Sequence, residues 1–108
     1  MKTQKFAYIW QYQIKDDHRA DFLAAYESSG KWAQLFQKDE AYIETILLVD
    51  DSDPDRFITI DFWTSKTGRD DFRNRYRSEY VELDGRCEEF TVAEGFIGDF
   101  VVASRHDP

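Results

Sequence analysis

The residue with the clearest chemical potential is Trp63. It closes a segment of alternating residues, 56–63, and a helix is predicted to begin directly after it, near residues 64–66. A large, electron-rich ring at such a strand-to-helix corner either fills the end of a core or forms the wall of a pocket. Which of these two roles it has decides whether the chain is an enzyme.

Other reactive side chains are few. The one cysteine, Cys87, is interpreted as a small hydrophobic residue on a helix, because a nucleophilic thiol needs a basic partner. His18 lies in a polar helix start and His106 in the tail, so neither is suitably placed. The acidic run 50–55 lacks the glycine that a calcium loop requires and is interpreted as a solvated turn. The sequence predicts neither a nucleophilic triad nor a metal site.

Composition and charge exclude several classes of protein. The 108 residues fit one domain, and a formal net charge of -8 argues against nucleic-acid binding. The main basic cluster alternates with acidic residues; it consists of Arg69, Arg73, Arg75 and Arg77. It is interpreted first as a solvated helix face and second as guidance for an anionic ligand. The single cysteine, the lack of a signal-peptide pattern and the lack of a spanning stretch predict a cytoplasmic protein that contacts no membrane.

Hydrophobic periodicity predicts one domain over residues 1–108, with a core over about 6–102 and a frayed C-terminal tail. The predicted strands are 6–14, 42–50, 56–63 and 91–102, and Gly95 and Gly98 mark a bend or bulge in the last. The predicted helices are one over about 17–28, a short one around 32–36, and a region that starts at Ser65 or Thr67 and breaks near Ser78 or Gly85.

The order strand, helix, strand, strand, helix, strand is the ferredoxin-like split β-α-β arrangement, an α+β fold with one four-stranded antiparallel sheet. Helices should cover one face of this sheet. The second strand carries aliphatic residues on both faces, with Ile46 and Leu48 opposite Ile43, Leu47 and Val49. An apolar face without helices needs another cover, and a second copy of the chain is the simplest one. We therefore expect a homodimer that pairs through the open sheet faces.

Several segments between about residues 6 and 100 match one known family. They are Tyr8-Ile9-Trp10, the helix stripe Phe22 to Tyr26, Asp53-Pro54-Asp55-Arg56-Phe57, Asp61-Phe62-Trp63-Thr64-Ser65, Phe72 and Ser78-Glu79-Tyr80. With its tryptophan–x–serine corner and later serine–x–tyrosine, the chain resembles the antibiotic biosynthesis monooxygenase family of dimeric α+β barrels. The resemblance implies a cleft between sheet and helices with Trp63 on its wall. By strand parity Thr59 and Asp61 share that side, and Tyr8 and Trp10 should face the same way.

The sequence departs from two groups within that family. In members that form polyketide quinones, the tryptophan matches Trp63, but asparagine stands at the position of Thr59 and tyrosine at about that of Arg69.

Haem-degrading members use a strand asparagine, a helix tryptophan and a helix histidine. Here those positions hold Trp10, Phe72 and either Glu82 or Asp84. No histidine would bind iron at that site, which argues against haem breakdown.

A cofactor-free oxygenase must hold an electron-rich phenol or hydroquinone, deprotonate it and exclude water, so that the anion can pass an electron to oxygen. Asp61 could be the base if burial raises its pKa, and Arg69 or Arg73 could favour the anion. The candidate catalytic residues are Trp63 and Asp61, and the candidate substrate-binding residues are Tyr8, Trp10, Thr59, Arg69, Phe72, Arg73 and Tyr76.

Each of these assignments has a structural alternative. Trp63, Trp10 and Phe72 would then be core residues, Asp61 would pair with a cation or cap the helix, and Tyr76 would lie in the core or an interface. The leading hypothesis is a homodimeric monooxygenase that needs no cofactor and acts on a small phenolic or quinol-type aromatic. The alternatives are a non-catalytic dimer that binds a small ligand, and an isomerase or lyase that uses Asp61 as a base without oxygen.

Overall fold

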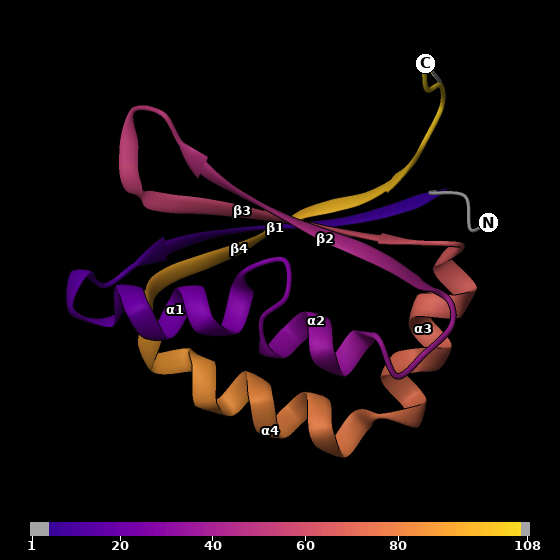
Figure 1. Ribbon diagram of the computed structural model, residues 1–108, viewed down its shortest axis with the longest axis horizontal. Coiled ribbons are helices and arrows are strands. Elements are labelled where there is room, and N and C mark those ends of the chain that lie inside the picture. The colour runs from indigo at the N-terminus through magenta and orange to yellow at the C-terminus, as the bar shows by residue number, and fades with distance from the viewer. Residues whose placement is uncertain (1–4, 107–108) are drawn as a thin grey trace.

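The computed structural model describes residues 5–106, which form one antiparallel sheet with helices on one side of it (Figure 1). The strands are β1 (Phe6–Ile14), β2 (Tyr42–Asp50), β3 (Asp53–Trp63) and β4 (Thr91–Val101). The helices are α1 (Arg19–Tyr26), α2 (Lys31–Phe36), α3 (Lys66–Arg75) and α4 (Arg77–Cys87), with 3₁₀ turns at Asp16–His18 and Glu88–Phe90. The strand order β2-β3-β1-β4 confirms the predicted α+β ferredoxin-like fold.

The element boundaries differ from the prediction at three places. The first predicted helix is a 3₁₀ turn followed by the shorter α1, and β3 starts at Asp53 rather than Arg56. The long helical region breaks at Tyr76, not at Ser78 or Gly85. Tyr76, the residue at the break, has φ -110° and ψ 30°, and its hydroxyl donates to the Lys38 carbonyl at 3.2 Å. Residues 107–108 of the predicted tail lie outside the described residues.

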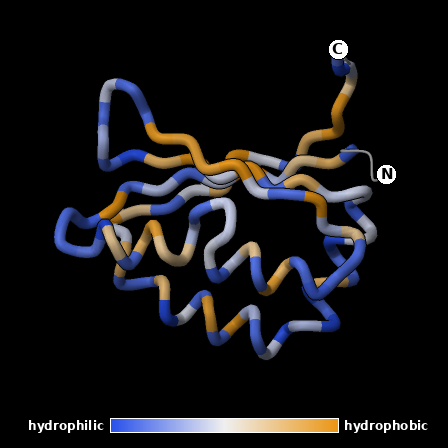
Figure 2. Tube along the Cα trace, viewed as in Figure 1, coloured by the Kyte–Doolittle hydropathy of each residue, from blue (hydrophilic) through white to orange (hydrophobic). Residues whose placement is uncertain are grey.

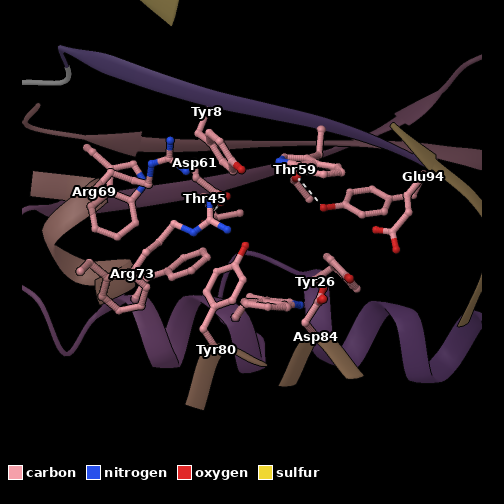
Figure 3. Close-up of a pocket in the computed structure, with 16 residues that line it drawn as sticks. Tyr8, Tyr26, Thr45, Thr59, Asp61, Arg69, Arg73, Tyr80, Asp84 and Glu94 are labelled. Carbon is pink, nitrogen blue, oxygen red and sulfur yellow. Dashed lines mark hydrogen bonds between the residues drawn. The ribbon is translucent and has the colours of Figure 1, made fainter. Parts of the chain in front are cut away.

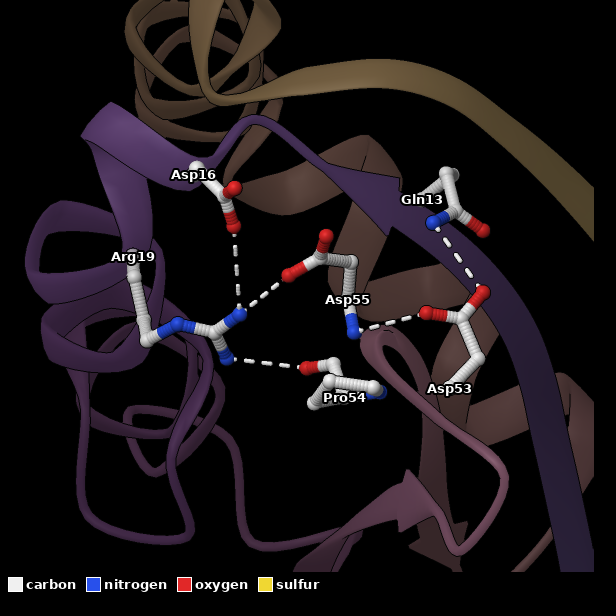
Figure 4. Close-up of polar contacts among 6 residues, drawn as sticks. All are labelled: Gln13, Asp16, Arg19, Asp53, Pro54 and Asp55. Atoms are coloured by element: carbon white, nitrogen blue, oxygen red, sulfur yellow. Dashed lines mark hydrogen bonds and ion pairs between the residues drawn. The ribbon is translucent and has the colours of Figure 1, made fainter.

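The hairpin of β2 and β3 is tied to the start of α1 by an arginine (Figure 4). Arg19 donates from Nη1 to the Pro54 carbonyl at 2.9 Å and pairs through Nη2 with Asp55 and Asp16. Asp53 accepts hydrogen bonds from Gln13 Nε2 and from the Asp55 backbone nitrogen. These contacts correct the interpretation of the acidic run as a purely solvated turn, and they explain why β3 begins early.

The sheet register places the predicted residues on one face. Tyr8 pairs with Asp61, Trp10 with Thr59 and Phe6 with Trp63 across β1 and β3. Because side chains on directly paired positions point to the same side of a sheet, these residues face the helices together. The predicted strand parity is therefore confirmed.

The register shifts at two places in the β1–β4 pairing and at two in the β2–β3 pairing, and one shift of each pair bears on the cavity. In β4, Gly98 pairs with Ile9 and Phe96 with Trp10, so Ile97 is the extra residue, near the glycines where a bulge was predicted. The shift sets Phe96 beside Trp10, with ring centroids 5.4 Å apart. In β2, Ile43 is the extra residue, since Tyr42 pairs with Trp63 and Glu44 with Phe62.

Aromatic rings dominate the layer between sheet and helices. Phe22 stacks on Tyr26 with centroids 4.4 Å apart, and Phe36 meets Phe72 edge-on at 5.4 Å. Figure 2 shows hydrophobic residues recurring along the strands and at intervals along the helices. Among residues 5–106, no helix is both long and apolar enough to cross a membrane. The core thus consists largely of flat, rigid side chains whose packing leaves space beside the sheet.

Candidate active site

A cavity of about 170 Å³ lies between the sheet and the helices (Figure 3). From the strands it is lined by Tyr8, Trp10, Tyr12, Thr45, Thr59, Asp61, Trp63 and Glu94, and from the helices by Tyr26, Trp32, Phe36, Arg69, Phe72, Arg73, Tyr80 and Asp84. The lining combines many rings with a few charged groups, the pattern typical of a small-molecule site.

The structure brings together all of the predicted site residues except Tyr76. The Tyr76 ring packs on Phe72 with centroids 5.2 Å apart, while its hydroxyl is engaged by the Lys38 carbonyl. Tyr76 is not among the residues that line the cavity. Its assignment to substrate binding is therefore corrected: it supports the cavity wall from behind Phe72.

Trp63 is both a core residue and a cavity residue. Its side chain is 1% exposed and meets Tyr42, Phe36 and Phe72, with ring centroids 5.3, 5.5 and 5.3 Å away. Its indole Nε1, however, has no hydrogen-bond partner among the described residues. The two roles considered for this ring are thus not exclusive, because the ring is held by the core on one side and borders the cavity on the other.

Asp61 is a buried carboxyl group, 7% exposed, on the central strand β3. Thr45 Oγ1 donates to Asp61 Oδ1 at 2.7 Å, and the Tyr42 hydroxyl lies 2.7 Å from Thr45 Oγ1. Burial raises the pKa of Asp61 to about 7, although the hydrogen bond from Thr45 and the charge of Arg69 both lower it. Such a group exchanges a proton near neutral pH, as a general base requires.

Arg69 is buried on α3, with 6% of its surface exposed. Its guanidinium carbon lies 3.9 Å from the centroid of the Tyr8 ring, a cation–π contact. Nη2 pairs with Asp70 at 3.3 Å and with Asp99 at 3.6 Å, whereas Nε and Nη1 have no hydrogen-bond partner within the described part of the chain. Ser65 caps α3 directly after Trp63, and this capping sets the first turn of the helix above the end of the sheet.

The basic cluster is therefore not one solvated face. Arg69 enters the cavity layer, Arg73 lies with its guanidinium carbon 4.8 Å from the Tyr80 ring centroid, and Arg75 pairs with the buried Asp39 at 2.7 Å. Arg77 is exposed. The second interpretation, in which part of this cluster guides an anion, fits the positions of Arg69 and Arg73.

The opposite end of the cavity is phenolic and acidic. The Tyr12 hydroxyl lies 3.3 Å from Thr59 Oγ1, and burial raises the pKa of Tyr12 well above its usual value. Burial, followed by the charges of Asp84 and Glu88, raises the pKa of Glu94. Figure 3 shows Arg69 at one end of the lining and Glu94 at the other. The cavity thus has a cationic end and an acidic end.

Sequence reasoning missed several lining residues. Tyr12 follows Tyr8 and Trp10 on the same strand face and was available from parity. Thr45 shares its parity with Leu47 and Val49, which pair with Thr59 and Phe57, so parity along β2 could have placed it on this face. Others come from helices whose placement no local pattern specifies: Tyr26, Trp32, Phe36, Tyr80 and Asp84, together with Glu94 on the edge strand.

This arrangement can hold a flat ring, accept a proton and favour an oxyanion. Asp61 supplies the proton acceptor, Arg69 the positive charge, and Trp63 with Tyr8 and Trp10 the aromatic walls. No group of three or more potential metal ligands is gathered anywhere in residues 5–106.

No family model and no curated protein matches the sequence. Solved structures do match. SnoaB, a cofactor-independent oxygenase from Streptomyces nogalater, superposes with a TM-score of 0.73 at 9% identity over 95% of this chain and 97% of its own. A Bacillus cereus protein proposed to be an antibiotic biosynthesis monooxygenase gives a TM-score of 0.65 at 13% identity, over 98% of this chain and 100% of its own.

The chain has the fold of the antibiotic biosynthesis monooxygenases. A dimeric ferredoxin-like protein from an uncultured marine organism has it too, with a TM-score of 0.69 at 14% identity, over 98% of this chain and 94% of its own. At such low identity the likeness establishes the fold alone, so the reaction has to be argued from the side chains of the cavity.

Proposed function

We propose that this protein is a cofactor-independent monooxygenase that oxidises a small phenolic or quinol-type aromatic. The observation that carries the proposal is that one aromatic cavity is lined by both a buried carboxyl group and a buried cation: Arg69 lies over the Tyr8 ring, and Asp61 is the strand partner of Tyr8. SnoaB, which shares the fold, is named a cofactor-independent oxygenase, and this supports the reaction class.

In the proposed reaction, Asp61 accepts the phenol proton and the charge of Arg69 stabilises the phenolate. The electron-rich anion passes an electron to O₂, and the two radicals combine at a ring carbon. One oxygen atom becomes a new carbonyl, while the other leaves as water with the hydrogens of the ring C–H and of the phenol. Phenol and O₂ thus give quinone and water, and the substrate supplies all of the electrons.

The size of the cavity limits the substrate. An apolar cavity of about 150 Å³ holds benzene, whereas pockets for drug-sized ligands occupy roughly 300–1,000 Å³. At about 170 Å³, this cavity suits one substituted ring. We therefore propose a monocyclic substrate.

We further propose a homodimer that pairs through the open sheet face. Ile46, Leu48 and Phe100 project from the side that carries no helix and are 37%, 44% and 46% exposed. A structural neighbour is named a dimeric ferredoxin-like protein, which supports this arrangement. Cys87, the single cysteine, is buried and in no disulfide, which supports the reducing cytoplasm that we propose as the location.

Oxygen uptake by the purified, metal-stripped protein tests the reaction. We expect consumption of O₂ with at least one monocyclic quinol or hydroxylated aromatic, and a loss of about 100-fold or more in the Asp61→Asn variant. Asp71→Asn, which alters an exposed carboxyl group on the same α3, is the matched control. If no compound in such a panel supports uptake, the oxygenase proposal fails and a non-catalytic ligand-binding protein is the better description.

A further inference from the structure

The bulge in β2 brings Tyr42 to the side of the sheet that carries the cavity. Tyr42 and Thr45 are three residues apart and would face opposite sides of a regular strand, but the extra residue Ile43 puts both on one face. There the Tyr42 hydroxyl lies 2.7 Å from Thr45 Oγ1. Bulges often re-aim a side chain next to an active site, and here the redirected group is a hydroxyl.

Tyr42, Thr45 and Asp61 form one hydrogen-bonded chain. Thr45 Oγ1 donates to Asp61 Oδ1 at 2.7 Å, and the two residues pair directly across β2 and β3. All three side chains are buried, so little water competes for these bonds. Thr45 and Asp61 line the cavity (Figure 3), whereas Tyr42 is not among its lining residues. Any effect of Tyr42 on chemistry in the cavity must therefore pass through its neighbours.

The direction of the chain follows from the number of hydrogens. A threonine hydroxyl has one hydrogen and an ionised carboxylate can only accept, so Thr45 gives its hydrogen to Asp61. Toward Tyr42 it can then only accept, which makes the Tyr42 hydroxyl the donor. Burial, which outweighs the hydrogen bond to Thr45, raises the pKa of Tyr42 to about 12. This hydroxyl therefore keeps its proton at physiological pH.

The chain makes the two oxygens of Asp61 different. Oδ1 is held by Thr45, whereas Oδ2 accepts no hydrogen bond from the described residues and is not among their fully buried, unpartnered atoms. Since Asp61 lines the cavity, Oδ2 is the oxygen that a ligand can reach. When a ligand hydroxyl gives up its proton, its O–H bond breaks, an Oδ2–H bond forms and the negative charge moves to the ligand. Thr45 donates to Oδ1 before and after this transfer.

We propose that Tyr42 is a positioning residue for Asp61: by donating to Thr45, it fixes the Thr45 hydroxyl as a donor to Oδ1 and leaves Oδ2 as the oxygen that accepts the proton. This deepens the proposed function and rests on it for the role of Asp61 as the base. The hydrogen-bonded chain itself can be measured with no substrate present.

Tyr42→Phe removes the hydroxyl and keeps the ring, which packs edge-on against Trp63 with centroids 5.3 Å apart. Because a hydrogen bond to the charged form lowers the pKa of a carboxyl group, weakening the bond from Thr45 should raise the pKa of Asp61. We expect a rise of about 0.1–0.5 pH units, since one hydrogen bond strengthens the next by about 10–30%. Thr45→Val removes the bond itself and should raise this pKa by about 1–2 pH units. Carbon-13 NMR of the aspartate carboxyl groups measures both changes.

A double variant separates a role through Thr45 from a general effect on the structure. Tyr42→Phe should raise the pKa of Asp61 in the parent protein and leave it unchanged in the Thr45→Val background, because the link between the two groups is then missing. An equal rise in both backgrounds, or none in the parent protein, overturns the inference.

The matched control is Tyr76→Phe. It removes a hydroxyl that donates to the Lys38 carbonyl outside the cavity, and it should leave the pKa of Asp61 unchanged. The other charged or titratable groups around the carboxyl group are present in every variant, so they cannot cause a difference; they are Arg69 on α3 and Tyr8 and Tyr12 on β1.

If Tyr42→Phe does not fold, as judged by circular dichroism, the hydroxyl protons of Tyr42 and Thr45 in the parent protein decide the matter. Both should be protected from exchange with solvent, and both NMR signals should shift as Asp61 titrates near pH 7. Hydroxyl protons that exchange freely, or signals that do not respond to this titration, overturn the chain.

The two proposals fail in different ways. Coupled changes in the pKa of Asp61, without oxygen uptake from any phenol or quinol, remove the oxygenase function and leave Tyr42 as the residue that positions the carboxyl group. Oxygen uptake without this coupling keeps the oxygenase and removes the role of Tyr42.

Discussion

The guanidinium carbon of Arg69 lies 3.9 Å from the centroid of the Tyr8 ring, and Tyr8 pairs across the sheet with Asp61. A cation and a carboxyl group therefore share one aromatic residue as a neighbour. The pKa of Asp61 nevertheless rises to about 7, because burial outweighs both the hydrogen bond from Thr45 and the charge of Arg69. The cavity holds an acid that changes charge near neutral pH next to a cation that does not.

The raised pKa predicts a stability that falls with pH. In the unfolded chain Asp61 titrates near 3.8, so between about pH 4 and 7 the folded state binds more protons than the unfolded state. The contribution of Asp61 to the free energy of unfolding therefore becomes less favourable over this window and is constant above it. Asp61→Asn removes this dependence, and we expect it to gain about 2–3 kcal/mol relative to the parent protein between pH 5 and 8.

Urea unfolding of both proteins at pH 5 and pH 8 measures this gain. Asp71→Asn changes an exposed residue on α3 and serves as the control. If the Asp61→Asn variant follows the same pH dependence as its parent, the carboxyl group does not titrate near 7 in the folded protein.

Strand parity is enough to predict much of the cavity from the sequence. Residues on alternate positions must share a face, so the grouping of Tyr8 and Trp10 with Thr59 and Asp61 is correct. Parity fails at Tyr42, because the extra residue Ile43 reverses the count between Tyr42 and Thr45, which share a face of β2. A bulge depends on partner strands and cannot be seen in one segment.

The burial of Arg69 is the harder feature to anticipate. Its neighbours in the sequence are charged, and a charged helix normally faces solvent. What places it in the cavity layer is the position of α3, whose N-cap, Ser65, lies two residues after the buried Trp63. Tyr76 was misassigned for a similar reason, since its contact with the Lys38 carbonyl joins residues that are distant in sequence.

Substitution of glycine by alanine should change the stability of the folded protein in opposite directions at Gly85 and Gly30. Gly85 lies within α4, and a Cβ added there meets nothing within 4 Å, so Gly85→Ala should stabilise the protein by about 0.5–1 kcal/mol. A Cβ at Gly30 would lie 2.7 Å from the Ala24 carbonyl oxygen, so Gly30→Ala should destabilise it by about 1–3 kcal/mol. Thermal unfolding of the two variants checks both signs, and a stabilised Gly30→Ala would contradict the close approach of α1 to this turn.

If two subunits pair through their open sheet faces, one charged substitution on that face should separate them. Leu48 projects from that face and is 44% exposed, so Leu48→Lys should place two buried charges in a sheet-to-sheet interface and yield monomers at micromolar concentration. Val81 is more exposed but lies on α4, on the helical side, and Val81→Lys should leave the dimer intact. Sedimentation equilibrium gives the masses. A monomeric parent protein, or equal effects of the two variants, would rule out this interface.

Thr45 offers a way to identify the catalytic base. With Asp61 in that role, kcat/KM for oxygen uptake should fall about tenfold per pH unit below about 7 and level off above it, because the base must be unprotonated in the free enzyme. The hydrogen bond from Thr45 lowers the pKa of Asp61, so Thr45→Val should move this limb to higher pH. Thr45→Ser keeps the hydroxyl group and should leave the limb where it is. Initial rates at low substrate concentration across this range measure the shift, and a limb that Thr45→Val does not move belongs to a base other than Asp61.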